Sequence, residues 1–429
     1  MNKIIEKDKQ HVWHPFTQHF TAETPLIIDK AEGVYLFDSE GNKYIDANSS
    51  WWVNVHGHAH PHIAKALTDQ FMKLDHTVFA GVTHEKAVEL ADRITGLLPE
   101  RMEKVFFSDN GSTAVEIGLK MIVQYWANKG ESKQRFLAMN GAYHGDTFGA
   151  MSVGQRGYFN RPFEPFFFDV DYIEFPTEEN QREVLEHAEK LFSSGEFAGM
   201  IVEPLVQGAA GMRMYSPAFL DQLVAIAKKH GVLVIFDEVM TGFGRTGRLF
   251  SMDHCTEKAD IVTMSKGLTA GVMALGLTVV TDEIYDAFLS KETTKALLHG
   301  HSFTANPIAC AVACANLELF ERKETWEGID DIIGWNADFA ETLRTIDCVE
   351  NIRQQGTILA FEIKTGEGNT YFSKMKEKAY DHFLSEGVLI RPLGNVIFVN
   401  PPFCIIEDEY MVIRESIETF LNLLTNGDD

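Results

Sequence analysis

The chain contains Gly231-Val-Leu-Val-Ile-Phe-Asp237-Glu238-Val-Met-Thr-Gly-Phe-Gly-Arg-Thr-Gly247 and, after a polar gap, Asp260-Ile-Val-Thr-Met-Ser-Lys266-Gly-Leu-Thr-Ala-Gly271. Each segment begins with a short apolar run and then reaches a charged residue. Such runs of β-branched and aromatic residues are typical of buried parallel strands in an α/β sheet. The pattern therefore predicts Asp237 and Lys266 where two neighbouring strands give way to loops, which is where open α/β sheets bind ligands.

A carboxylate and an amine in one crevice suit pyridoxal phosphate. The aldehyde of this cofactor needs a lysine with which to form a Schiff base, and its ring nitrogen needs an anion to stay protonated. The alternative for Asp237 and Lys266 is a structural salt bridge, and these two residues alone leave it open.

Further motifs resemble one family. The stretch from Phe236 to Gly247, together with Ser265-Lys266-Gly267, is similar to the class III aminotransferases, which are pyridoxal-phosphate enzymes of fold type I. Within that family, the chain resembles the subfamily of biotin biosynthesis, which aminates 7-keto-8-aminopelargonate. The motifs that carry this second resemblance are Trp13-His-Pro15, Ser49-Ser-Trp51-Trp52, His56-Gly57, Asp109-Asn-Gly111-Ser112, Tyr143-His-Gly-Asp146-Thr-Phe-Gly-Ala-Met-Ser152, Val206-Gln-Gly208 and Ile390-Arg391-Pro392.

The resemblance implies an α/β protein whose large domain has a mostly parallel seven-stranded sheet and whose smaller domain is also α/β. We expect residues 1–50 to contribute to the small domain and the substrate pocket, 51–316 to form the large cofactor-binding domain and 317–429 the small domain. The chain's own pattern predicts about seven βα-type strands. Strands are expected at residues 104–108, 135–139, 198–205 and 275–280, in the two opening segments, and C-terminally at 357–363, 388–392 and 396–400. A hairpin is expected from residues 34–38 and 42–46, a helix starting at Ser216-Pro217, and a C-terminal helix at 371–385. Residues 159–175, rich in phenylalanine and proline, are expected to form an excursion against the sheet.

The resemblance also implies a role for each matching residue. Lys266 would hold the cofactor and move the proton, Asp237 would pair with the pyridinium nitrogen, and Tyr143 would stack on the cofactor ring. Gly111 and Ser112 would hold the cofactor phosphate. The substrate-binding residues implied in this way are Phe16, Trp51, Trp52, Tyr143, Lys266, Gly300 and Arg391, with Asp146 in a supporting role.

The segment that contains Gly300, His301 and Ser302 matches the part of the family that crosses a dimer interface. There a hydroxyl residue grips the partner's cofactor phosphate, so a homodimer with shared active sites is expected. Many relatives have Pro-Thr where this chain has His301-Ser302, and often Tyr where it has Phe16. Because these departures lie at the pocket, the amino donor stays open between S-adenosylmethionine and lysine.

Several of these residues also have simpler explanations. Trp51 and Trp52 could pack in a core, and Asp146 could be a solvated turn residue. Arg391 could form a surface salt bridge, which would contribute little stability. At the Gly111 turn, a capping box with Thr113 as the N-cap is the structural alternative to an anion site, and both can hold together.

Two rival functions remain. One is a class III aminotransferase for another substrate, such as an ω-amino acid. The other is a metal-dependent hydrolase built on His56-Gly-His58-Ala-His60-Pro-His62, because alternating histidines on a strand would share one face. Gly57 and Pro61 break a strand at that point, and Pro61 instead suits the first turn of a helix. We therefore expect no metal site.

The composition excludes several partner classes. A net charge of −24 argues against nucleic acid and against an anionic membrane surface. No apolar run approaches the roughly 20 residues needed to span a bilayer. Five cysteines without framework spacing, and a charged Met1–His14 segment without an apolar h-region, indicate a cytoplasmic protein with reduced thiols.

Overall fold

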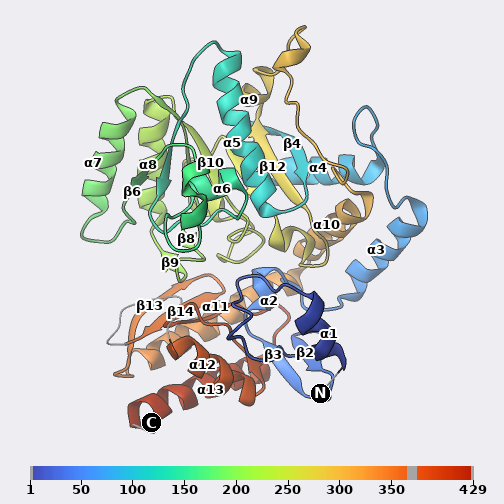
Figure 1. Ribbon diagram of the computed structural model, residues 1–429, viewed down its shortest axis with the longest axis vertical. Helices are drawn as coiled ribbons and strands as arrows, with labels where there is room; N and C mark the ends of the chain where they lie inside the picture. Colours follow the sequence, from blue (N-terminus) through green and yellow to red (C-terminus); the bar gives the residue numbers. More distant parts are fainter. Residues whose placement is uncertain (1–2, 365–373, 427–429) are drawn as a thin grey trace.

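A seven-stranded sheet forms the centre of the larger part of the molecule (Figure 1), in a computed structural model that describes residues 3–364 and 374–426. Its strand order is β4-β12-β11-β10-β7-β5-β6. Only β12 runs against the other strands, so the expected mostly parallel seven-stranded sheet is confirmed. The strands are β4 (Met102–Ser108), β5 (Arg135–Met139), β6 (Val170–Ile173), β7 (Phe197–Val202), β10 (Leu233–Asp237), β11 (Ile261–Met264) and β12 (Gly276–Thr281).

The edge strand β6 lies in the region 159–175, where an excursion was expected. Residues 161–166 do form an irregular 3-10 helix, but Val170–Ile173 then pairs in parallel with β5. Only Ile173 in this strand is fully buried. A four-residue strand at a sheet edge carries too short an apolar run to be distinguished from its phenylalanine-rich surroundings.

Helices cover both faces of this sheet because successive strand residues point in opposite directions. In β10, Ile235 faces α5 and lies in one apolar core, whereas Val234 and Phe236 lie in the other. The helices of this region are α3 (Pro61–Lys73), α4 (Glu85–Leu97), α5 (Gly111–Asn128), α6 (Phe148–Val153), α7 (Gln181–Phe192), α8 (Pro217–Lys229), α9 (Asp282–Asp286) and α10 (Pro307–Phe320). Two short strands, β8 (Val206–Gln207) and β9 (Arg213–Met214), form a separate ribbon.

The N-terminal strands share a sheet with the C-terminal part of the chain (Figure 1). The expected hairpin forms from β2 (Tyr35–Asp38) and β3 (Lys43–Asp46), flanked by β1 (Ile28–Glu32), and β15 (Val388–Leu389) pairs in parallel with β3. Arg391 was expected inside a strand, but it lies two residues beyond β15 and before Pro392, which has no N–H to continue a ladder.

The remaining C-terminal elements form a second layered unit. Its antiparallel sheet has the order β13-β14-β16, and β13 was not expected from the sequence. The elements of this unit and of the N-terminal segment are β13 (Val349–Gln355), β14 (Ile358–Ile363), β16 (Val396–Val399), α1 (Lys3–His11), α2 (Ser49–Trp52), α11 (Lys323–Leu343), α12 (Lys374–Ser385) and α13 (Glu407–Asn426). The helix expected at 371–385 begins outside the described residues.

The N-cap residues of two helices can be compared with those expected from the sequence. Ser216 caps α8 by accepting from the Phe219 amide, with Pro217 in the first turn, as expected. At α5 the capping residue is Asn110 rather than Thr113, because the Asn110 side chain accepts from the Thr113 amide. Within the described ranges, no helix has the length and apolar character needed to cross a membrane.

The turn between β13 and β14 gives a test of the fold. Gly356 has φ +57°, and a Cβ there would fall 2.2 Å from the Thr246 carbonyl carbon. We expect Gly356→Ala to lower the free energy of unfolding by about 2 to 4 kcal/mol through strain and overpacking. Gly334 in α11 has open space around it, so Gly334→Ala should be neutral or stabilising by up to about 1 kcal/mol. Urea denaturation gives the free energy of unfolding of each variant and of the wild type. Equal values for the two variants would contradict this prediction.

Candidate active site

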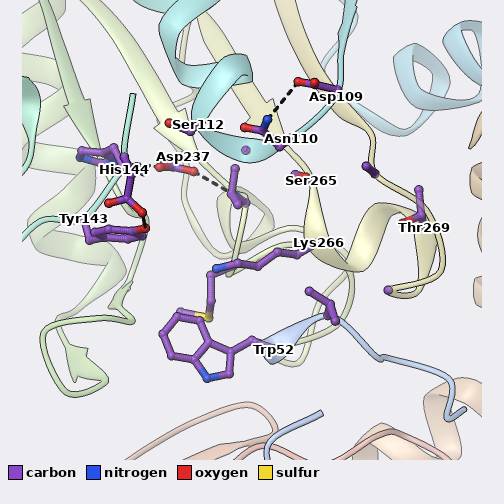
Figure 2. A pocket seen from close by; sticks show the side chains of 18 of the residues that line it. Trp52, Asp109, Asn110, Ser112, Tyr143, His144, Asp237, Ser265, Lys266 and Thr269 are labelled. Carbon is purple, nitrogen blue, oxygen red and sulfur yellow. Dashed lines mark hydrogen bonds and ion pairs between the residues drawn. The ribbon is translucent and has the colours of Figure 1, made fainter. Parts of the chain in front are cut away.

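Asp237 and Lys266 lie at the carboxyl ends of adjacent parallel strands. Asp237 is the last residue of β10, and Lys266 opens a 3-10 helix, η3 (Lys266–Thr269), just beyond β11. Both residues line a cavity of about 640 Å³. Figure 2 shows the Lys266 side chain extending into this cavity towards the Trp52 ring. The crevice expected from the two opening segments is therefore present.

The carboxylate of Asp237 is buried and held by hydrogen bonds. His144 Nδ1 lies 2.7 Å from Asp237 Oδ2, and the Val239 amide donates to Oδ1 at 3.1 Å. His144 is itself buried, and its Nε2 has no hydrogen-bond partner among the described residues. No role for His144 could be predicted from its motif, because only the fold brings residue 144 to residue 237.

The Lys266 amine is surrounded by protein and points at the cavity. Its Nζ lies 4.6 Å from the centre of the Trp52 ring. Burial lowers the pKa of this amine to about 8, although the nearby carboxylates of Asp237 and Glu203 act in the opposite direction. A substantial fraction of a lysine with this pKa is neutral near physiological pH, as a nucleophile or general base requires.

Glu203 is a second buried carboxylate on the cavity wall. It accepts from the Tyr143 amide and from the Gly208 amide, both at 3.0 Å. Burial raises the pKa of Glu203 to about 7, although His144 and the two amides favour the charged form. The Tyr143 hydroxyl donates to Asp146 Oδ2 at 3.0 Å. Glu203 and Asp146 therefore hold the Tyr143 segment at both its backbone and its side chain.

The start of α5 forms a wall of the cavity that contains little side-chain bulk. A Cβ on Gly111 would fall 2.6 Å from Val239 Cγ1, and one on Gly145 would fall 2.4 Å from Ser112 Cβ, so both positions require glycine. The Ser112 hydroxyl accepts from the Thr147 amide at 3.0 Å. Because glycine leaves little side-chain bulk at this helix N-terminus, its free backbone N–H groups are open to an anion such as phosphate.

These features fit the cofactor expected from the sequence. The cavity provides an amine for an aldehyde, a buried carboxylate for a ring nitrogen and a helix N-terminus for a phosphate. Tyr143 and Trp52 supply aromatic surfaces beside them. The residues present thus match the functional groups of pyridoxal 5′-phosphate.

Three predicted substrate residues lie together outside the cavity. The Phe16 and Trp51 rings have centres 5.8 Å apart, and the Arg391 guanidinium carbon lies 5.4 Å from the centre of the Trp51 ring. Trp51 is 45% exposed, whereas Trp52 is 7% exposed and packs against Lys266. The two tryptophans therefore face different surroundings, and Trp51 belongs to a rim beyond Trp52.

The segment with Gly300, His301 and Ser302 does not reach this cavity. It forms a turn before α10 in which the Thr304 hydroxyl accepts from the His301 amide at 3.1 Å. Its neighbours Leu298 and Phe303 are 73% and 61% exposed. Any cofactor contact from this segment therefore lies outside the cavity that its own chain forms.

The four histidines at 56–62 have separate partners. His58 bonds Asp46 at 2.9 Å, His62 bonds Glu318 at 2.6 Å, and His56 packs 4.7 Å from the Phe320 ring centre. His60 caps α3. Over residues 3–364 and 374–426, no group of three His, Cys, Asp or Glu residues could hold a metal ion.

Comparison with known proteins identifies the class. The chain belongs to the class III aminotransferases, because the family model described as Aminotransferase class-III matches residues 17–421. This family depends on pyridoxal phosphate.

Individual relatives fall within this class. The chain is 43% identical to the adenosylmethionine-8-amino-7-oxononanoate aminotransferase of Synechococcus elongatus, over 96% of this chain and 98% of that one. The solved structure of the enzyme of the same name from Methanocaldococcus jannaschii has a TM-score of 0.94 and 34% identity, and covers all of both chains. An (S)-enantioselective omega-transaminase from Thermomicrobium roseum has a TM-score of 0.92 and 28% identity over 98% of both.

The His144 contact gives a test of the site. His144→Leu would leave the Asp237 carboxylate buried without its partner. A hydrogen bond to a charged group is worth about 1.5 to 3 kcal/mol, so we expect cofactor binding or kcat to fall about 10- to 100-fold. His144→Asn keeps a side-chain N–H donor and should recover part of the loss. Cofactor titration measures binding, and steady-state rates measure kcat, for both variants. A leucine variant with wild-type cofactor affinity and kcat would contradict this role of His144.

Proposed function

We propose that this aminotransferase acts in biotin biosynthesis, transferring an amino group to 8-amino-7-oxononanoate, also called 7-keto-8-aminopelargonate, to give 7,8-diaminopelargonate. The names of the relatives from Synechococcus elongatus and Methanocaldococcus jannaschii support this substrate. The amino donor that we propose is S-adenosylmethionine, which those names also include. Lysine is the alternative donor.

The row of side chains from Lys266 to Arg391 is the observation that carries this proposal. The Lys266 amine lies over Trp52, Trp51 is the residue directly before Trp52, and Arg391 stands over the Trp51 ring. A long unbranched substrate with a ketone near one end and a carboxylate at the other matches such a row. The guanidinium would bind the carboxylate in two-point geometry, while the tryptophans contact the alkyl chain.

The protein's own residues divide the work of the reaction. Lys266, with its lowered pKa, would take the proton from the donor carbon and deliver it to the neighbouring carbon of the cofactor. Asp237 keeps a negative charge beside the ring nitrogen, and His144 fixes its orientation. Pyridoxal phosphate, when bound, withdraws electrons from the bond that breaks and carries the amino group between half-reactions.

The remaining residues orient and enclose the reactants. Tyr143 lies on the cofactor side of the cavity, with its hydroxyl held by Asp146. Gly111 and Ser112 present the start of α5 to the phosphate. Phe16 closes the rim beside Trp51. Phe16 lacks the hydroxyl of the common family tyrosine, which removes one hydrogen bond of about 0.5 to 1.5 kcal/mol to a substrate.

A homodimer with shared active sites completes the proposal. Gly300, His301 and Ser302 lie outside their own chain's cavity, which agrees with contacts to the partner's cofactor phosphate and substrate. The exposed Leu298 and Phe303 beside them would be covered by such an interface. We also place the protein in the cytoplasm, where the thiols of its five cysteines remain reduced.

The roles of Lys266 and Asp237 can be separated by substitution. Lys266→Ala removes the group that moves the proton, so transamination should fall by more than about 10³-fold. Asp237→Asn should still bind the cofactor yet transaminate about 10²- to 10³-fold more slowly, since the charge beside the ring nitrogen is lost. Cofactor content and steady-state rates are measured for both variants. Substantial turnover by the alanine variant would reject the mechanism.

The donor is identified by a half-reaction. Purified protein in its pyridoxal form is mixed separately with S-adenosylmethionine, lysine and an ω-amino acid, and the absorbance change to the pyridoxamine form is followed. We expect conversion by S-adenosylmethionine. Conversion by lysine alone would indicate that Phe16 and His301-Ser302, which differ from the common family residues, help to select the donor.

An ω-amino acid transaminase is the second candidate, favoured by the structural similarity to the Thermomicrobium roseum enzyme. Conversion by the ω-amino acid, with no response to the other two donors, would replace the proposed function with this one. After conversion by S-adenosylmethionine, adding 8-amino-7-oxononanoate should return the pyridoxal form. Failure of that return would reject the proposed acceptor.

A further inference from the structure

The turn that carries the two tryptophans, Ser49–Trp52, has an unusual backbone. Ser49, Ser50 and Trp52 have φ angles of +49°, +58° and +64°, in the left-handed region that residues with a Cβ rarely adopt. Ser50 combines its φ with a ψ of −93°, close to a γ-turn of positive φ, which is rare and strained. Such residues persist only where the surrounding structure fixes them. Contacts around the turn therefore have to hold it in this conformation.

Asp46, the last residue of β3, makes two of these contacts. Its side chain is fully buried. Oδ1 accepts from the Ser50 amide at 2.7 Å, and Oδ2 accepts from the Ser50 hydroxyl at 2.8 Å. Hydrogen bonds to an ionised carboxylate are stronger than those between neutral groups. One carboxylate thus holds both the backbone and the side chain of the residue in the γ-turn.

His58 connects Asp46 to the far end of the turn. Its Nε2 lies 2.9 Å from Asp46 Oδ2, and its Nδ1 lies 2.8 Å from Asn54 Nδ2. The Asn54 amide donates to the Ser49 carbonyl at 3.3 Å. The His58 backbone is itself fixed by an antiparallel bridge to Gly33. Asp46, His58 and Asn54 therefore hold the turn from both of its ends.

This turn sends the two indole rings to different places. The Trp52 ring is buried beneath the Lys266 amine, whereas the Trp51 ring is exposed and lies beside Arg391. The direction of a side chain follows from the backbone conformation of its residue. A relaxed turn would therefore move one ring relative to the other and interrupt the row of side chains between Lys266 and Arg391.

We propose that Asp46 is a positioning residue that makes the enzyme selective for a long unbranched ketone over a short one. Together with His58, it fixes the turn so that both indole rings contact the alkyl chain of the substrate. This inference rests on the proposed acceptor, 8-amino-7-oxononanoate. Asp46 does not line the cavity of Lys266, so a short ketone that occupies only this cavity should not depend on it.

The test compares two acceptors in the second half-reaction. The pyridoxamine form is prepared from the apoprotein and pyridoxamine phosphate, and the return of the pyridoxal absorbance is followed with 8-amino-7-oxononanoate or with 3-aminobutan-2-one. The short ketone keeps the reacting end of the long one and lacks its chain and its carboxylate. The ratio of the two second-order rate constants, long over short, measures the selectivity.

Asp46→Asn is the first variant. Asparagine leaves one acceptor oxygen for the two Ser50 donors and for His58, and it removes the charge. We expect the ratio to fall about tenfold, through the rate constant for the long ketone alone. A fall of both rate constants together would indicate a purely structural role and would overturn the proposal. Thermal unfolding of each variant is measured alongside.

His58→Leu and His62→Leu form a matched pair. His62 also pairs with a carboxylate, since its Nε2 lies 2.6 Å from Glu318 Oε2, but this pair joins α3 to α10. We expect the ratio to fall about three- to fivefold for His58→Leu, which frees Asp46 and Asn54 from one partner, and to stay at the wild-type value for His62→Leu. Equal ratios in the two leucine variants would overturn the proposal.

Two substitutions of Ser50 distinguish backbone strain from the loss of a hydrogen bond. Ser50→Ala and Ser50→Gly both remove the hydroxyl that donates to Asp46, but only glycine adopts a positive φ without a steric cost. We expect the ratio to fall about three- to fivefold in the alanine variant and to stay within about twofold of the wild type in the glycine variant. Equal losses in both would contradict the role of Asp46 in holding a strained turn.

The same measurements separate this inference from the proposed function. A wild-type protein with equal rate constants for the two ketones would reject the proposed acceptor, and the inference with it. Selectivity that is present in the wild type and unchanged in Asp46→Asn would overturn the inference alone.

Discussion

The hydrogen bond between His144 and Asp237 is the interaction on which the site depends most. A carboxylate removed from water costs several kcal/mol unless fixed partners replace its hydration. Asp237 obtains those partners from the loop after β5 and from the backbone directly after β10. The Thr263 hydroxyl in β11 is a third donor, at 3.4 Å, so the carboxylate has all its partners only when β5, β10 and β11 are aligned as in the folded sheet.

The electrostatics of the cavity follow from this placement of charge. Asp237 and Glu203 both lie on its wall, and both raise the proton affinity of Lys266. Burial of the amine opposes them and is the larger effect, because the pKa of Lys266 is lowered. The nitrogen at the centre is therefore held near the balance between its two protonation states.

The sequence contained enough information to predict the crevice but less of what surrounds it. The positions of Asp237 and Lys266 followed from apolar runs, because burial on both faces of a strand leaves a local pattern. The pairing of His144 with Asp237 left no such pattern, since 93 residues separate them. The short strand β6 and the place of Arg391 after β15 depend on pairing with distant strands. The N-cap of α5 was misassigned by three residues because Asp109, Asn110, Ser112 and Thr113 all have side chains that can serve as caps.

The pairing of β15 with β3 has a consequence for the order of events during synthesis. Asn48 donates to the Phe398 carbonyl and Ser49 to the Asn400 carbonyl, immediately before the two tryptophans. These contacts span some 350 residues, so they cannot form until nearly the whole chain has left the ribosome. β3, one of the first strands made, is thus among the last to gain its second partner strand. The wall of the pocket that carries Trp51 and Trp52 is completed only with the C-terminal sheet, after the central sheet has had time to fold.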